Sequence, residues 1–282
     1  MKITYPRRTL LKYLVLIALF ISFESQALVT SPIPLAPNES LIEVKIIREG
    51  GLIEPNENRQ SFQPAKIDIY QLAVSHALGN PFAFGQDHFV RLEYRNFISG
   101  KEEFYAADRG QSLTATYGFN FVHTPAYSAG LYAGISPVTQ FNQDKFSVPR
   151  VDLFHFGLTS GLEINSNWFL THSIHYGSGI PDKQNSYISL TNFLGYKTQG
   201  WSLKLGPYLE FDITERADAN YDAKYSAAGT SDRIKAAKFG ILGFLEYAIT
   251  AETAINAGFI QKQSGYDAVA TNALILGIST RF

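Results

Sequence analysis

The chain has 282 residues, which is enough for one large domain or two small ones. Charged residues make up only 17%, and the net charge of −1 leaves no broad basic face, which argues against nucleic-acid binding. The absence of cysteine excludes disulfides, thiolate metal sites and thiol catalysis.

The N-terminal segment has the order of a secretory signal. A basic stretch, 2–12, is followed by an apolar run, 13–23, and then by small residues before a predicted cut after Ala27. The alternative is an N-terminal membrane anchor, but an apolar run of about 11 residues is short of the roughly 20 that a spanning helix needs. We therefore predict a cleaved signal peptide over 1–27.

Residues 28–40 contain several prolines and no periodicity, which predicts an extended periplasmic lead-in. From residue 41 onward the dominant pattern has a period of two. In Trp201–Ile213, apolar residues alternate with polar ones, as in a strand that has one apolar and one polar face. Pro207 interrupts this row, so we expect a bulge or an unpaired donor position there.

The same pattern predicts about twelve strands, with ten or fourteen as alternatives. Most of them are about 9–13 residues long, and a tilted strand needs roughly 9–11 residues to cross a bilayer. The predicted strands are 41–48, 66–78, 87–97, 112–122, 128–135, 151–164, 168–177, 186–196, 201–213, 234–247, 253–261 and 272–282.

Long connections alternate with short turns along this series of strands. Outer-membrane barrels show the same alternation, with their short turns in the periplasm. A sandwich of two sheets does not require this alternation of long and short connections. We therefore predict an all-β fold over 41–282: a single antiparallel, up-and-down transmembrane β-barrel.

Five aromatic residues are expected at one level of this barrel, near the short turns. Tryptophan and tyrosine favour the membrane–water interface because their rings are apolar but carry a polar edge. The alternative is that these aromatics are scattered through a soluble core. The predicted interface residues are Trp168, Tyr196, Trp201, Tyr247 and Phe282.

The final segment, LILGISTRF, has apolar residues at alternate positions and ends on the aromatic Phe282. In this it resembles the C-terminal strand of bacterial outer-membrane β-barrel proteins. The resemblance implies a place in the cell outer membrane, with the lipid bilayer as surroundings. It also implies recognition of the last strand by the barrel-assembly machinery.

The polar face of each strand is expected to point into the lumen. One interpretation is a porin-like, water-filled channel through which small polar solutes pass. A second is a structural network of opposite charges that fills a closed barrel, which would then act through the surface loops 136–150 and 214–233. The predicted lumen residues are Arg91, Glu93, Arg95, Lys204, Tyr208, Glu210, Asp212, Lys238 and Glu246.

A lipid-modifying hydrolase is the remaining hypothesis. The stretch Thr171–Asp182 resembles, loosely, the His-x-Ser element of outer-membrane phospholipases and lipid A deacylases. In such an element the imidazole of the histidine activates a serine hydroxyl on the same face of the strand. The match is incomplete, because Gly177 stands two residues after His175. Ser173 and Ser178 are the remaining candidate nucleophiles, and ordinary strand histidines are the alternative.

Neither a cofactor nor a metal is predicted. The six histidines are scattered, and no glycine-rich phosphate loop is present. Asp218, Asp222 and Asp232 lie in a long polar loop, where acidic residues normally serve solvation.

Overall fold

The computed structural model describes residues 35, 38–53, 63–99, 109–141, 152–178, 186–213, 237–264 and 271–282. The predicted signal 1–27, most of the lead-in 28–40 and the acidic loop residues Asp218, Asp222 and Asp232 lie outside these ranges. Within the described part, no helix is long and apolar enough to span a membrane.

All the regular elements in these ranges are strands. They are β1 (Ser40–Ile53), β2 (Gln63–Gly79), β3 (Gln86–Ser99), β4 (Arg109–His123), β5 (Tyr127–Phe141), β6 (Phe154–Glu163), β7 (Trp168–Ser178), β8 (Tyr187–Lys197), β9 (Trp201–Asp212), β10 (Ala237–Ala248), β11 (Thr253–Ser264) and β12 (Thr271–Arg281). Each strand pairs with its neighbours in sequence, and β1 pairs with β12 to close the barrel. The prediction of a closed, antiparallel, up-and-down barrel with twelve strands is therefore confirmed.

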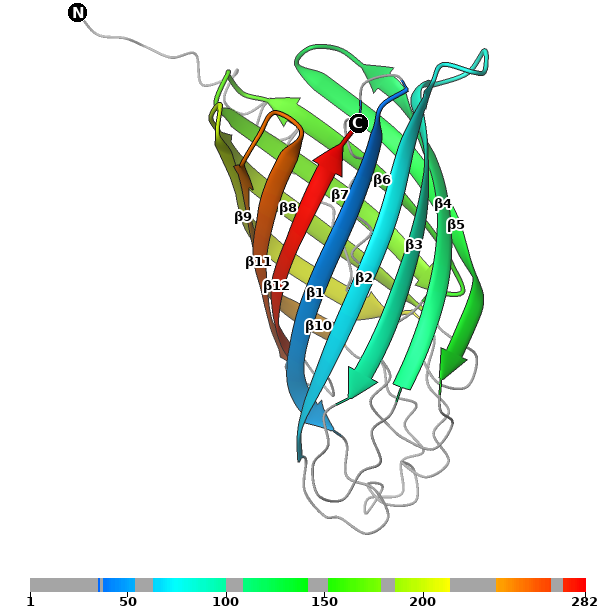
Figure 1. Cartoon of the computed structure of the whole chain (residues 1–282), viewed down its shortest axis with the longest axis vertical. Helices are drawn as coiled ribbons and strands as arrows, with labels where there is room; N and C mark the ends of the chain where they lie inside the picture. The colour runs from blue at the N-terminus through cyan, green and yellow to red at the C-terminus, as the bar shows by residue number, and fades with distance from the viewer. Residues whose placement is uncertain are drawn as a thin grey trace, which may run out of the picture.

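The closing pair joins the two ends of the sheet. Ser40 and Phe282 exchange backbone hydrogen bonds of 2.9 and 3.0 Å, and the ladder continues from Leu41 opposite Arg281 to Gly50 opposite Asn272. In Figure 1 the C-terminus lies at the upper end of the barrel. We call this end the short-turn end, because the connections 80–85, 124–126, 164–167, 198–200 and 249–252 lie there.

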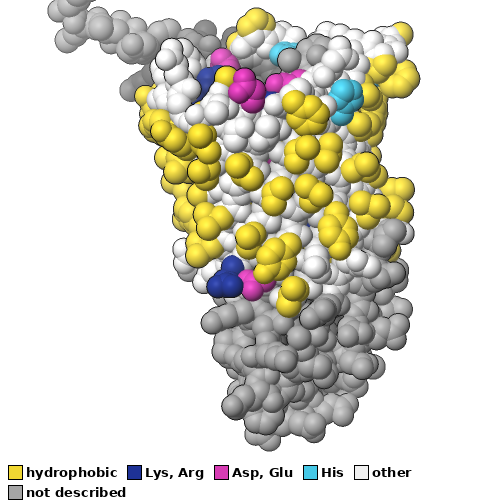
Figure 2. Space-filling view, in the orientation of Figure 1, with side chains coloured by type: hydrophobic (Ala, Val, Ile, Leu, Met, Phe, Trp, Pro, Cys, Tyr) yellow, Lys and Arg dark blue, Asp and Glu magenta, His cyan; other side chains and the backbone are white. Residues whose placement is uncertain are grey.

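The two faces of the wall differ as the period of two predicts. On β1, Val44 and Ile46 are 47% and 50% exposed on the outer face, whereas Glu43 and Lys45 are buried on the inner face. Figure 2 shows hydrophobic side chains spread over the outer face, with charged side chains above and below them. An apolar outer surface of this kind suits contact with hydrocarbon.

The strand β5 departs from its predicted range at Pro137. The prediction ended β5 at Ile135, yet β5 continues to Phe141, because the register shifts between Leu113 and Ala115 and so accommodates Pro137. Residues 136–141 are therefore strand, not the start of a surface loop.

At Pro207 the ladder between β8 and β9 is interrupted, as expected for a residue without an N–H donor. Pairing stops at Leu194–Leu205 and resumes, in the same register, at Thr191–Tyr208. Gly206 fits the gap, since a Cβ atom there would overlap the backbone carbonyl of Asn192.

Aromatic rings gather at the short-turn end. Trp168 and Trp201 both contact Tyr196, with ring centroids 4.9 and 5.4 Å apart. Tyr247 pairs with Trp201 in register, and the exposed Phe282 lies at the same end. This is the arrangement that an interfacial belt of aromatics requires.

A second ring cluster at this end was not predicted. Phe82 and Phe84, in the connection between β2 and β3, are half-exposed and stack at 5.4 Å. Both contact His88, which is fully buried and bonds Tyr117 and the carbonyl of Phe84.

Introducing a charge on the outer face tests whether this face contacts lipid. Leu276 lies at the middle of β12 and is 64% exposed, so Leu276→Arg should lower the free energy of unfolding by about 2–4 kcal/mol in lipid vesicles. Ile249→Arg, in a turn at the barrel end, should cost no more than about 1 kcal/mol. Denaturant titration in phospholipid vesicles measures both, and equal costs would contradict a membrane position for this face.

Candidate functional site

The inner face of the barrel holds the residues that the sequence analysis assigned to the lumen. Arg91, Glu93 and Arg95 lie on β3 and are at most 5% exposed. Tyr208 and Glu210, on β9, are buried and hydrogen-bonded to each other. The side chains of Asp212 and Lys238 lie outside the described part.

The remaining two predicted lumen residues lie nearer the short-turn end. Lys204 is half-buried, and Glu246 is exposed. Both alternate with exposed apolar neighbours on their strands, which places them on the inner face. The lumen is therefore more open near Glu246 than beside the buried residues of β3.

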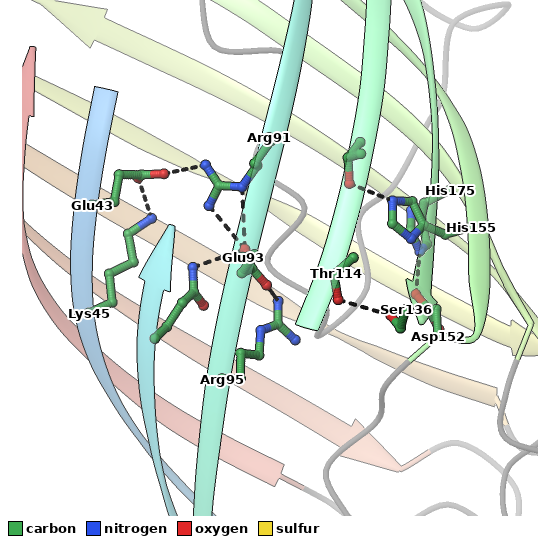
Figure 3. A network of polar contacts seen from close by, with 12 residues as sticks. Glu43, Lys45, Arg91, Glu93, Arg95, Thr114, Ser136, Asp152, His155 and His175 are labelled. Atoms are coloured by element: carbon green, nitrogen blue, oxygen red, sulfur yellow. Dashed lines mark hydrogen bonds and ion pairs between the residues drawn. The ribbon is translucent and has the colours of Figure 1, made fainter. Parts of the chain in front are cut away.

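A network of charges covers the inner wall of β1, β2 and β3 (Figure 3). Arg91 binds Glu43 and binds Glu93 at 3.0 Å, while Lys45 binds Glu43 at 2.7 Å. Arg95 binds the other carboxylate oxygen of Glu93. The sequence analysis missed Glu43 and Lys45, although they alternate with Ile42, Val44 and Ile46 as lumen residues should.

The hydrogen bonds and ion pairs of this network offset the free-energy cost of burying its charges. Removing a charge from water costs several kcal/mol unless partners surround it. Glu93 is supported on three sides, since Gln71 also donates to it at 3.1 Å. Arg91 also donates to Ser75 at 3.1 Å. The network holds three cations and two carboxylates, and Glu49, buried further along the inner face of β1, brings this wall to equal numbers of positive and negative charges.

A second network, of rings and one carboxylate, lies on the wall of β4 to β8 (Figure 3). Asp152 precedes β6 and accepts hydrogen bonds from His175 at 3.0 Å and Tyr187 at 2.9 Å. The other ring nitrogen of His175 bonds the Tyr132 hydroxyl at 2.9 Å. His155 bonds Thr116 at 3.1 Å.

Glycines make room for this second network. On three successive strands a ring and a glycine lie two residues apart: Tyr132 and Gly134, His155 and Gly157, His175 and Gly177. The register brings each glycine beside a ring of a neighbouring strand, so that a Cβ atom would overlap that ring. The rings of Tyr132, His155 and Tyr187 therefore lie along the wall, over Gly157, Gly134 and Gly177.

The Tyr132–His175 and His155–Thr116 hydrogen bonds of this network each cross an intervening strand, which presents a glycine at that position. Tyr132 on β5 reaches His175 on β7 over Gly157. His155 on β6 reaches Thr116 on β4 over Gly134. The repeated ring-x-Gly spacing is the signal from which this network could have been found.

The inner face is not uniformly polar, which corrects the simple two-face prediction. A buried apolar cluster joins opposite parts of the inner wall: Ile47, Ile69, Phe97, Phe193, Tyr208, Leu242, Ile260, Ala273 and Ile275. Ile275, Ile47, Ile69 and Phe97 form one continuous register row across β12, β1, β2 and β3. Hydrophobic packing thus fills part of the lumen.

Several buried polar atoms of the inner wall have no hydrogen-bond partner in the described part of the protein. They are Gln71 Oε1, Arg95 Nε, Ser112 Oγ, Asp152 Oδ1, Thr171 Oγ1, Ser173 Oγ and Thr191 Oγ1. Buried polar groups need partners, so this wall is suited to water or to a polar solute.

The hydrolase candidates do not form a catalytic pair. Both ring nitrogens of His175 are engaged, by Asp152 and Tyr132, and the Ser173 hydroxyl does not bond either of them. Ser178 lies an even number of residues from Ile174 on β7, so its side chain faces outward as that of Ile174 does.

His172 shares this outward parity and bonds Asn192 on the neighbouring strand. It therefore lies on the opposite face of the wall from His175. Among the described residues, no group of three or more His, Asp or Glu side chains could hold a metal ion.

Comparisons with known proteins support the fold. An outer-membrane channel from Pseudomonas putida F1 shares it with a TM-score of 0.65 and 13% sequence identity, over 88% of this chain and 97% of that one. The translocator domain of the autotransporter NalP from Neisseria meningitidis gives a TM-score of 0.52 and 11% identity, over 99% of each chain. No protein-family model and no curated protein matches the sequence.

Removing Arg91 tests the charge network. Arg91→Met should lower the free energy of unfolding by about 3–5 kcal/mol, because Glu43 and Glu93 both lose a buried partner. The control is Arg48→Met, which breaks an exposed pair with Asp68 on the outer wall and should change stability little. Denaturant unfolding in lipid vesicles compares them, and a small effect for Arg91→Met would refute a closely coupled network.

Filling a glycine position tests the ring arrangement. In Gly177→Ala the new methyl group meets only side-chain atoms, of Asp152 and Tyr187, so the ring should be displaced into the lumen and the bond to Asp152 lost. Gly243→Ala is the matched control, since it displaces the Phe259 ring on the outer face. Ion conductance in planar bilayers should fall for Gly177→Ala alone; an equal fall for both would contradict this arrangement.

Proposed function

We propose that this protein is a porin-like channel for the passive passage of small polar solutes across the bacterial outer membrane. The observation that carries the proposal is the set of buried, unpartnered polar atoms along the inner wall of a closed barrel. Such atoms are costly unless water or a solute satisfies them, so an interior of this kind must be hydrated.

The outer face supports the membrane position. Exposed apolar side chains cover it between the ring belt at the short-turn end and the Arg48–Asp68 pair near the other end. Barrels satisfy every backbone group internally and can therefore cross hydrocarbon. The fold is shared with the Pseudomonas putida F1 outer-membrane channel.

The burial of the inner residues limits what can pass. Arg91, Glu93 and Arg95 are at most 5% exposed, whereas Glu246, near the short-turn end, is exposed. The lumen is thus more accessible near Glu246 than beside the charges of β3, and a passage that is least accessible there would suit small solutes. The apolar cluster that includes Ile47 and Phe193 narrows it further.

Two further parts of the proposal concern the route to the membrane. The segment 1–27 would direct export and be removed. The last strand, ending at Phe282, would be read by the barrel-assembly machinery. Blocked cleavage or assembly in variants of Ala27 and Phe282, respectively, would support these roles.

Single-channel recording in planar bilayers tests the proposal directly. A channel gives discrete conductance steps with the purified, refolded barrel. A closed structural barrel that acts through its loops gives none, and that outcome would end the channel proposal.

The charge network predicts a direction for ion selectivity. Glu93→Gln removes a carboxylate and leaves its two bound arginines, so the wall gains net positive charge and the anion-to-cation permeability ratio should rise several-fold. Asp68→Asn also removes a negative charge, but from the outer wall, and should leave the ratio unchanged. Reversal potentials in a salt gradient measure both; an unchanged ratio for Glu93→Gln would remove this network from the ion path.

A further inference from the structure

The facing inner positions of β7 and β8 form an uncharged track along the wall. Starting at the short-turn end, Phe169 faces Gly195, Thr171 faces Phe193, Ser173 faces Thr191, and His175 faces Ser189. Rings therefore stand at both ends of the track and hydroxyl groups lie between them. This composition differs from the wall of β1 to β3, which carries the charge network.

Three hydroxyl groups of this track are buried and have no partner in the described part of the protein. They belong to Thr171, Ser173 and Thr191. The same neighbourhood contains other buried polar groups, such as His175 and Tyr187, and these are bonded. Three of the seven unpartnered atoms of the described inner wall thus lie on one short stretch of two paired strands.

The chemistry of these groups indicates the kind of solute that fits. A hydroxyl group both donates and accepts hydrogen bonds, so a row of them matches a solute with several hydroxyl groups of its own. Ring side chains offer flat apolar surfaces, which suit the C–H face of a saturated ring. No charged residue occupies an inner position from Phe169 to His175 or from Ser189 to Gly195, so a neutral solute meets no unpaired charge there.

We propose that this track, formed by Phe169, Thr171, Ser173, Thr191 and Phe193, is a binding path for neutral, ring-shaped polyhydroxylated solutes such as sugars. The proposal rests on the channel function and names the class of solute. The solute would enter past Phe169, which is half-buried near the short-turn end, and exchange hydrogen bonds with the three hydroxyl groups as it moves.

Block of the ion current by glucose tests the proposal. A sugar bound in the lumen obstructs ions, so glucose should reduce the current through the wild-type channel in a saturable manner. In the double variant Ser173→Ala, Thr191→Val the half-blocking concentration should rise about tenfold, as expected for the loss of two hydrogen bonds. Each half-blocking concentration is measured relative to the same variant's own current without glucose.

Ser112→Ala is the matched control. Ser112 is 1% exposed and its hydroxyl is also unpartnered in the described part, but it lies on β4, outside the track. Its half-blocking concentration should equal that of the wild type. Equal changes in both variants, or no block in a conducting wild type, would overturn the track while leaving the channel proposal intact.

A binding measurement separates the two proposals. If the wild-type protein does not conduct, the channel proposal fails. Calorimetric titration of the detergent-solubilised barrel with glucose then decides on the track alone. Binding that the double variant loses and Ser112→Ala keeps would support the track, whereas no binding to the wild type would overturn it.

Discussion

The pairing of β1 with β12 is the interaction on which the rest of the structure depends. Hydrocarbon offers no hydrogen-bond partners, so a sheet with a free edge would leave a row of backbone groups unsatisfied at several kcal/mol each. The ladder from Leu41–Arg281 to Gly50–Asn272 removes that edge. Once the sheet is closed, each strand has an outside and an inside, and the alternation of side chains decides which residues meet lipid and which meet the lumen.

Closure also brings many inner side chains together in the lumen. These side chains are accommodated in three ways. Opposite charges on β1 and β3 satisfy one another, apolar residues such as Ile47 and Phe97 pack together, and rings on β5 to β8 lie over glycines. The glycines matter most for the space that remains in the lumen. A ring beside an alanine would have to project toward the barrel axis, whereas the Tyr132 ring extends along the wall and reaches His175 two strands away.

The period-two pattern was sufficient to predict the strands and their faces, because both depend on local alternation. It could not predict which inner residues meet. Arg91 and Glu43 lie far apart in the sequence and are joined only through the registers of β1, β2 and β3. The apolar row of Ile47, Ile69 and Phe97 depends on the same registers, so the prediction of a uniformly polar interior failed there.

The sequence interpretation was wrong at two places, where the effect of a local residue depends on its surroundings in the fold. A proline normally ends a strand, but the irregular register opposite Leu113 and Ala115 lets β5 continue beyond Pro137. The histidines of β7 suggested catalysis because the stretch that contains them resembles a His-x-Ser element. Their parity separates them, since His172 bonds Asn192 on the outer side while His175 bonds Asp152 inside.

The two inner walls differ in what they would offer a solute in the proposed channel. Charges that pair among themselves, as Arg91 does with Glu43 and Glu93, are stable when buried but retain little net field for attracting ions. A wall whose hydroxyl groups lack protein partners keeps its hydrogen-bonding capacity for whatever enters. Hydrogen-bonding capacity, more than charge, is therefore what this lumen offers a solute, and Ser173 and Thr191 stand where that capacity is concentrated.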